Sequence, residues 1–325
     1  MPKRLAVATL AIALLAACGP NARIGKADGG PWKIVSGNGT TVSTTTTPTR
    51  IIAQSDTAAS LLAYGIKPVG IFGNENPKDN KNLKGYDLSG IAILGAEWGE
   101  VDVEKAATLK PDLIVSDYWP AEKAYGGFEA GVNAKSKKLA DLAPVVGGSQ
   151  GNSIVTLLEF YQRLARSLGA DVDDTSDEAA FDKAVIGFKA ATAAKKGLTA
   201  LAVSPAKDLL YVAVPKLAPE LRDFQRWGLG VITPRDPDPK FPYWENLSWE
   251  NADKYQPDLL LVDDRSYPAN LNEAKNQPTW DSIGAAKAGA VVPWPCYWIH
   301  SYKTYAEQLV KLTHEINNAN ASIGS

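Results

Sequence analysis

The sequence contains few of the side chains that most often serve as nucleophiles, proton carriers or metal ligands. Only two cysteines and two histidines occur among its 325 residues. Cys18 and Cys296 cannot form a disulfide framework, and Cys296 stands in an aromatic stretch where we expect a small buried hydrophobe. Zinc and manganese sites usually recruit several imidazoles, so His300 and His314 predict no site for a bare metal ion.

An excess of charge is also lacking. The 34 basic and 36 acidic residues leave a formal net charge of −2, and no block of lysine and arginine occurs. Nucleic acid is therefore not expected as a partner. Beyond the N-terminal segment, no apolar run reaches the roughly 20 residues that a membrane-spanning helix needs.

Two familiar catalytic arrangements are missing as well. The sequence has no His-Glu-x-x-His helix of a metalloprotease, and its only two histidines, His300 and His314, stand in one short region and leave no plausible catalytic triad,. Paired carboxylates could serve a glycosidase, but Asp263-Asp264 and the pair Asp236 and Asp238 stand where turn caps are expected. We expect a protein that is not an enzyme, and an exported hydrolase is the catalytic alternative.

What the sequence does contain begins at its N-terminus. Lys3-Arg4 and the apolar run Leu5–Ala17 precede Cys18, which is typical of a secretory signal peptide over residues 1–17. The four residues that end at Cys18 resemble the lipobox of bacterial lipoproteins, where the cysteine is acylated by chains such as palmitate. More than one acyl chain makes membrane attachment stable, so we expect an anchor at Cys18 on the outer face of the cytoplasmic membrane.

Residues 18–48 are expected to form a flexible tether. The stretch Thr40–Thr49 is almost entirely threonine and serine, and it offers too little apolar surface to offset the entropy of ordering it. A short hairpin around Trp32–Val35 is compatible with this tether, and an extra edge strand is the alternative to it. Gly19 and the threonine-rich stretch favour a Gram-positive envelope.

The remaining chain alternates short β-rich runs with helical ones, which predicts an α/β architecture. Apolar strands are expected at 50–53, 112–116, 198–203 and 258–262, and a long helix over Ser176–Lys196. That helix would be roughly 30 Å long, about the diameter of a small domain. We expect an N-terminal lobe over 49–170, an interdomain helix over 171–197 and a C-terminal lobe over 198–325.

One segment is echoed later in the chain. Glu104–Val115 and Glu250–Leu261 both place a glutamate seven residues before a Pro-Asp pair, and an apolar strand follows in each. Proline ends the preceding short helix because its ring and missing N–H block continuation. Two copies on either side of a long helix suggest two similar lobes.

These features together resemble the solute-binding lipoproteins of bacterial ABC importers for ferric siderophores, haem and vitamin B12. The resemblance rests on the lipobox, on Pro48–Ile52, on Tyr64–Gly70, on the two Pro-Asp units and on Trp280–Val292. It implies two Rossmann-like α/β lobes joined by a single long helix (a class III solute-binding protein), a ligand in the cleft and no resident cofactor. The implied partners are an ABC permease with its ATPase and a small iron chelate, and the implied state is a monomer.

The resemblance also assigns roles to residues. It implies that Glu104 and Glu250, one on each lobe, meet arginines of the permease, which bind carboxylates in a bidentate, charge-assisted geometry. The alternative is that each glutamate only stabilises its own helix N-terminus. A ferric siderophore is the expected cargo, and a corrinoid such as vitamin B12, or haem, is the alternative.

Ligands of open α/β lobes gather at the carboxyl ends of the strands. Trp98 and Trp244 each stand six residues before an echoed glutamate. Arg265 could meet a ligand anion or pair locally with Asp263 or Asp264. The expected ligand-binding residues are Trp98, Tyr118, Trp119, Tyr211, Trp244, Arg265, Tyr267 and Trp298.

Overall fold

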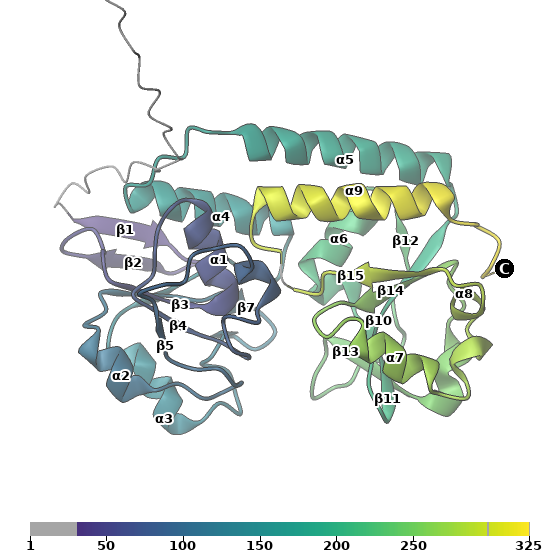
Figure 1. Cartoon of the computed structure of the whole chain (residues 1–325), viewed down its shortest axis with the longest axis horizontal. Helices are drawn as coiled ribbons and strands as arrows, with labels where there is room; N and C mark the ends of the chain where they lie inside the picture. Colours follow the sequence, from purple (N-terminus) through teal and green to yellow (C-terminus); the bar gives the residue numbers. More distant parts are fainter. Residues whose placement is uncertain (1–30, 298, 325) are drawn as a thin grey trace, which may run out of the picture.

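The structure is a computed structural model of the chain, and it describes residues 31–297 and 299–324. The predicted signal peptide, Cys18 and Trp298 lie outside the described residues. None of the helices in the described ranges combines the length and apolarity required to cross a membrane. Figure 1 shows two lobes side by side, with two long helices across the top.

The N-terminal lobe is built on a five-stranded parallel sheet in the order β5-β4-β3-β6-β9. Its strands are short, and the central ones are buried except for Gln54 at the end of β3. The strands are β3 (Ile51–Gln54), β4 (Gly70–Phe72), β5 (Ala92–Ile93), β6 (Leu113–Val115) and β9 (Val145–Val146). The helical segments of this lobe are α1 (Ser55–Ala63), η1 (Lys81–Leu83), α2 (Val103–Thr108), α3 (Ala134–Lys137), η2 (Lys138–Asp141) and α4 (Ile154–Ser167).

The C-terminal lobe contains a mixed sheet in the order β13-β11-β10-β14-β15, with β12 also paired to β10. β10, β12, β14 and β15 pair in parallel, whereas β11 and β13 run antiparallel to their neighbours. The strands are β10 (Thr199–Pro205), β11 (Leu209–Ala213), β12 (Gly230–Val231), β13 (Trp244–Ser248), β14 (Leu259–Asp263) and β15 (Val291–Trp294). The helical segments are η3 (Pro215–Leu217), α6 (Pro219–Arg226), η4 (Trp249–Lys254), α7 (Ala269–Lys275), η5 (Trp280–Ser282), α8 (Gly284–Lys287) and α9 (Tyr302–Asn318).

The two Pro-Asp pairs occupy equivalent places in the two lobes. Asp112 accepts hydrogen bonds from the backbone N–H groups of Thr49 and Arg50, both at 2.8 Å, just before β3. Asp258 accepts from the backbone N–H of Thr199 at 2.8 Å, at the start of β10. Each aspartate therefore ties its own strand to the start of the neighbouring central strand. The repeated sequence is thus a repeated structural unit, as the echo predicts.

The prediction of a flexible segment over 18–48 is wrong for its last part. β1 (Trp32–Val35) and β2 (Thr41–Thr44) form an antiparallel hairpin in which Trp32 faces Thr44. The Trp32 side chain is only 4% exposed, and its indole N–H donates to the Ser167 hydroxyl of α4 at 2.9 Å. One large buried ring therefore orders a segment whose composition alone predicts a tether, and the expected hairpin is observed.

The long helix α5 (Ser176–Ala194) lies beside α9 across the top of the molecule (Figure 1). Its first turn reaches α4, where Gln162 Nε2 and Glu178 Oε2 are 3.4 Å apart. Further along, Phe181 packs on Tyr305 of α9 with ring centroids 5.1 Å apart. The predicted two-lobed fold with a connecting helix is confirmed, but α5 is paired with α9 instead of standing alone.

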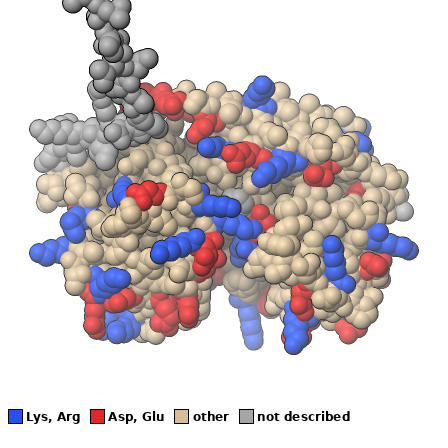
Figure 2. All heavy atoms as spheres, viewed as in Figure 1, with Lys and Arg blue, Asp and Glu red and all other residues tan. Residues whose placement is uncertain are grey.

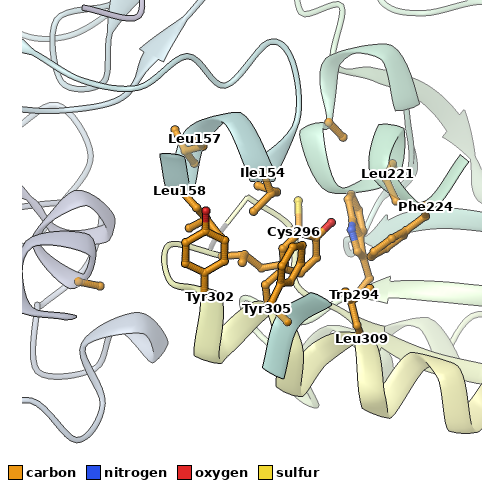
Figure 3. Packing of buried hydrophobic residues seen from close by; sticks show 14 of the residues in the cluster. Ile154, Leu157, Leu158, Leu221, Phe224, Trp294, Cys296, Tyr302, Tyr305 and Leu309 are labelled. Atoms are coloured by element: carbon orange, nitrogen blue, oxygen red, sulfur yellow. The ribbon is translucent and has the colours of Figure 1, made fainter. Parts of the chain in front are cut away.

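The lobes meet through a continuous hydrophobic core. Figure 3 shows its central part, to which α4, α6, α9 and the segment after β15 all contribute side chains. The labelled residues are Ile154, Leu157, Leu158, Leu221, Phe224, Trp294, Cys296, Tyr302, Tyr305 and Leu309. Because these elements belong to both lobes, the lobes cannot separate without exposing the shared core.

Two buried carboxylates of α6 lie at this junction. Asp223 accepts hydrogen bonds from the Ile154 N–H at 3.0 Å, from the Tyr305 hydroxyl at 2.9 Å and from the Ser153 hydroxyl. Since Ser153 is the N-cap of α4, a side chain of the C-terminal lobe completes the cap of an N-terminal-lobe helix. Glu220, one turn earlier, accepts from the backbone N–H of Tyr297 at 3.2 Å.

Glu220 predicts a pH-dependent stability. Burial raises the pKa of Glu220 to about 7, from an ordinary value of 4.5. Stability contributed by the protonated form is therefore complete below pH 4.5 and is lost as the pH rises through 7. Glu220→Gln keeps a neutral acceptor for Tyr297, so we expect its free energy of unfolding, relative to wild type, to rise by roughly 2–3 kcal/mol between about pH 5 and about pH 8.

Denaturant unfolding of both proteins at the two pH values measures this difference. The neighbouring Asp223, whose pKa burial also raises, is present in both proteins and cancels in the comparison. Parallel pH profiles for the two proteins would contradict the assignment to Glu220.

Candidate ligand-binding cleft

A cavity of about 260 Å³ lies between the lobes, at the carboxyl ends of strands from both sheets. Figure 2 shows the molecule hollowed along its lower edge between the two lobes. Gln54 ends β3 and Ser55 follows it, Ser116 follows β6, and Arg265 follows β14. The sheets therefore present this edge to one common space, as the rule for open α/β sheets predicts.

Aromatic rings form one wall of the cavity. Trp119 and Tyr297 line it, and their rings pack edge-to-face with centroids 5.2 Å apart. Tyr243, Trp244 and Trp294 stand behind Tyr297 at centroid distances of 6.3, 6.5 and 6.4 Å. Tyr297 has a backbone φ of +61°, a left-handed conformation that is uncommon for a non-glycine residue, and the bond from its N–H to Glu220 helps to hold it there.

A buried polar network forms the opposite part of the cavity. Asp117 accepts from His300 Nε2 at 2.7 Å, from Gln150 Nε2 at 2.6 Å and from the Tyr161 hydroxyl. In the tautomer that donates from Nε2 to this carboxylate, the His300 Nδ1 accepts from the Asn82 amide at 3.2 Å. His300 follows β15, whereas Asp117 follows β6 in the other lobe, so the network joins the two lobes at the cavity.

Two cations lie at the cavity and both have acidic partners. Lys81 of η1 bonds to the backbone carbonyl of Asp264 across the lobe boundary, and its ammonium is 3.8 Å from the Asp264 carboxylate. Arg265 holds Asp263 with a two-point contact, with Nε–Oδ1 at 3.1 Å and Nη2–Oδ2 at 2.6 Å. Of the two alternatives for Arg265, the local ion pair is present, and the residue also lines the cavity.

The cavity also contains a thiol. Cys296 lines it and is fully buried, and burial raises the pKa of the Cys296 thiol well above its usual range. A protonated thiol is a poor nucleophile. Among the described lining residues, the arrangement offers ring faces and hydrogen-bonding groups for holding a ligand.

The predicted ligand-binding residues fall into three groups. Trp119 and Arg265 line the cavity, and Tyr211 and Trp244 pack on each other nearby at a ring distance of 6.2 Å. Three others lie elsewhere. Tyr118 packs on Tyr125, Tyr267 lines a second and more open groove below α9, and Trp98 is 50% exposed and donates to Glu129 at 3.2 Å.

The predicted symmetry of Trp98 and Trp244 is not found, since Trp244 is only 6% exposed. The sequence-based prediction favoured aromatic residues and missed several polar residues that line the cavity. These are Asp56, Glu75, Asn80, Asn82, Asp117, Glu129 and Gln150. Asp56 and Asp117 come soon after β3 and β6, so the strand-end rule applied to polar residues would have found them. Glu129 and Gln150 lie in loops, and no sequence signal marks them.

The two echoed glutamates are both exposed and far from the cavity lining. Glu104 lies in the first turn of α2, and its side chain is 86% exposed, with Lys135 at 3.7 Å. Glu250 lies in the first turn of η4, where hydrogen bonds from its own backbone N–H and from Ser248 lower its pKa. Both carboxylates are therefore accessible to a partner protein.

Comparison with known proteins finds a matching family and several similar structures. The family described as periplasmic binding protein matches residues 51–297. The ferric-siderophore receptor protein DesE from Streptomyces coelicolor is similar in structure, with a TM-score of 0.79, 34% identity and coverage of 89% of this chain and 99% of that one. FhuD2 from Staphylococcus aureus, solved with bound ferrioxamine B, has a TM-score of 0.58 at 18% identity over 83% of this chain and 97% of that one, which shows the shared fold.

A sequence relative adds to this picture. The Fe(3+)-citrate-binding protein YfmC of Bacillus subtilis (strain 168) is 24% identical over 229 residues, which is 70% of this chain and 66% of that protein. The match therefore spans slightly under two thirds of the relative. The family match covers most of the chain, including both sheets and the cavity between them. The chain belongs to the periplasmic binding protein family.

Proposed function

We propose that this protein binds a ferric siderophore in the cleft between its lobes and delivers it to the permease of an ABC importer. The observation that carries the proposal is the cavity itself, which lies at the carboxyl ends of both sheets and has Trp119 and Tyr297 on one wall. Aromatic faces suit the apolar parts of a large chelate, and the polar groups around them suit its oxygen atoms. Similarity to DesE, a ferric-siderophore receptor protein, supports this cargo.

The proposed action is binding and release without chemical change. The shared core and the contacts of Asp223 hold the lobes in one relative orientation. Closure around a ligand would therefore be a small movement of side chains and loops at the cavity, such as the Lys81–Asp264 contact. A preformed site loses little free energy to ordering when the ligand binds.

We further propose that the protein is exported and anchored by lipid at Cys18, on the outer face of the membrane of a Gram-positive cell. Lys3-Arg4, the apolar run Leu5–Ala17 and the cysteine that follows support this placement,. The first described strand, β1, begins at Trp32. The lobes would thus lie close to a permease in the same membrane.

For docking, we propose that Glu104 and Glu250 each meet an arginine of the permease. Their exposure, their charge and their equivalent positions in the two lobes support the proposal. An arginine at each would form a bidentate pair with the carboxylate. Two such pairs, one on each lobe, would fix the orientation of the protein on the permease.

Ligand binding is tested with the purified protein lacking residues 1–17. Ferrioxamine B should quench tryptophan emission saturably and without turnover, because Trp119 lies at the cavity. Trp119→Ala should weaken binding about tenfold or more, as expected for a central aromatic contact. Trp249→Phe, in the core of the C-terminal lobe, is the control and should bind like the wild type.

The titration should extend to ferric citrate, a ferric catecholate, haem and cobalamin. Saturable binding of haem or cobalamin alone would replace the siderophore with the alternative cargo. If the emission and the heat of mixing stay unchanged for every compound, the proposed function is wrong.

The docking proposal predicts that binding and uptake can be separated. Glu104→Ala combined with Glu250→Ala should leave the Kd for the chelate within about twofold, because neither residue lines the cavity. Uptake of the iron chelate by cells that carry only this variant should fall about tenfold or more, since two charge-assisted pairs are lost. Glu159→Ala with Glu307→Ala, two exposed glutamates on α4 and α9, is the matched control, and wild-type uptake by the first variant would remove the docking role.

A further inference from the structure

The cavity is lined by several carboxylates that form no ion pair within the described ranges. Asp56 and Glu75 share the Asn80 amide, whose Nδ2 is 3.1 Å from an oxygen of each. Burial, and next the nearby Asp56, raise the pKa of Glu75, which indicates that the two carboxylates repel each other. None of the ion pairs recorded among residues 31–297 and 299–324 includes Asp56, Glu75 or Glu129.

Two further acceptors in the cavity have no donor. Gln150 is 1% exposed, and because its amide nitrogen must face the Asp117 carboxylate, its Oε1 is the atom left over. That oxygen is buried without a hydrogen-bond partner in the described part of the chain, and so is Oε2 of Glu129. Both residues line the cavity. A buried acceptor without a partner is unfavourable by about 1–3 kcal/mol, so these atoms point to a ligand that brings donors.

The cations near the cavity are paired with other carboxylates, although the charge of Lys81 also acts weakly on Glu75. Lys81 is bonded to Asp264 and Arg265 to Asp263, and in each pair the aspartate supplies the opposite charge. Hydrogen-bond acceptors and negative charge are therefore what the cavity offers to a ligand. A bare metal ion does not fit this set, because no group of three or more His, Cys, Asp or Glu side chains within the described ranges could hold one.

We propose that Asp56, Glu75, Glu129 and Gln150 form a subsite that selects ferric chelates carrying a protonated amine or a similar cationic donor group. The inference rests on the proposed function and deepens it by naming the charge class of the cargo. The ammonium group would lie between the Asp56–Glu75 pair and Glu129, and it would supply the donors that Gln150 Oε1 and Glu129 Oε2 lack. Anionic chelates, such as those of citrate, would meet like charge there and bind weakly.

A pair of chelates that differ by one charge tests the subsite in the wild-type protein. Ferrioxamine B has a free terminal amine, and its N-acetylated derivative keeps the same iron coordination and chain but loses the positive charge. We expect the amine form to bind about tenfold tighter. We also expect the preference to shrink as salt is raised, because exposed charge pairs are screened.

Glu129→Gln and Glu75→Gln locate the effect. Each keeps a hydrogen-bonding group of nearly the same shape, and each should reduce the preference for the amine form over the N-acetylated form to about threefold or less. Glu159→Gln, the same change at an exposed position on α4, should keep the full preference.

The outcomes separate the two proposals. Equal affinity of wild type for both chelates, or a preference that survives in both variants, would overturn the subsite and leave siderophore binding in place. Tighter binding of ferric citrate than of either trihydroxamate would also overturn it. If no ferric chelate binds at all, the proposed function fails and the subsite fails with it.

Discussion

One buried carboxylate sets the relation between the two lobes. Asp223, which has no exposed surface, accepts from the N-terminus of α4 in one lobe and from Tyr305 of α9. Hydrogen bonds to a charged group each contribute about 1.5–3 kcal/mol, and donors left unpaired at this depth would be strongly unfavourable. Because the surrounding core is shared by both lobes, the lobes are fixed before any ligand arrives. The cavity between them is therefore a property of the fold, and a ligand has only to fill it.

The same junction shapes the chemistry of the cleft. The segment after β15 is held at two points. Glu220 accepts a hydrogen bond from the backbone N–H of Tyr297, and Asp117 accepts one from His300. Tyr297 is thereby presented to Trp119 in a left-handed backbone conformation. The aromatic wall and the polar network are thus two ends of one short segment. Ring contacts and acceptor groups reach the ligand together, and this combination suits a chelate with both apolar and donor surfaces.

Much of the architecture could be predicted from the sequence because its causes are local. Alternating strands and helices, glycine and proline stops, and the repeated Pro-Asp unit all act within a few residues, and the two lobes follow from them. Trp119 and Arg265 were also predictable, since each closely follows a strand end. The sequence also suggested a hairpin around Trp32–Val35, but its docking on the lobe was not predictable, because that depends on Trp32 bonding to Ser167, which is 135 residues away. The polar network was not predictable either, because Asp117 and His300 are 183 residues apart.

That separation has a consequence for folding. His300 and Tyr305 complete hydrogen bonds begun by Asp117 and, on α6, by Asp223. The sheet of the N-terminal lobe, from β3 to β9, contains neither residue, but its side of the cleft is finished only when the segment that carries them docks. A partly folded chain with that sheet intact therefore has no complete cleft, and the capacity to hold a ligand arises only with the contacts between distant segments.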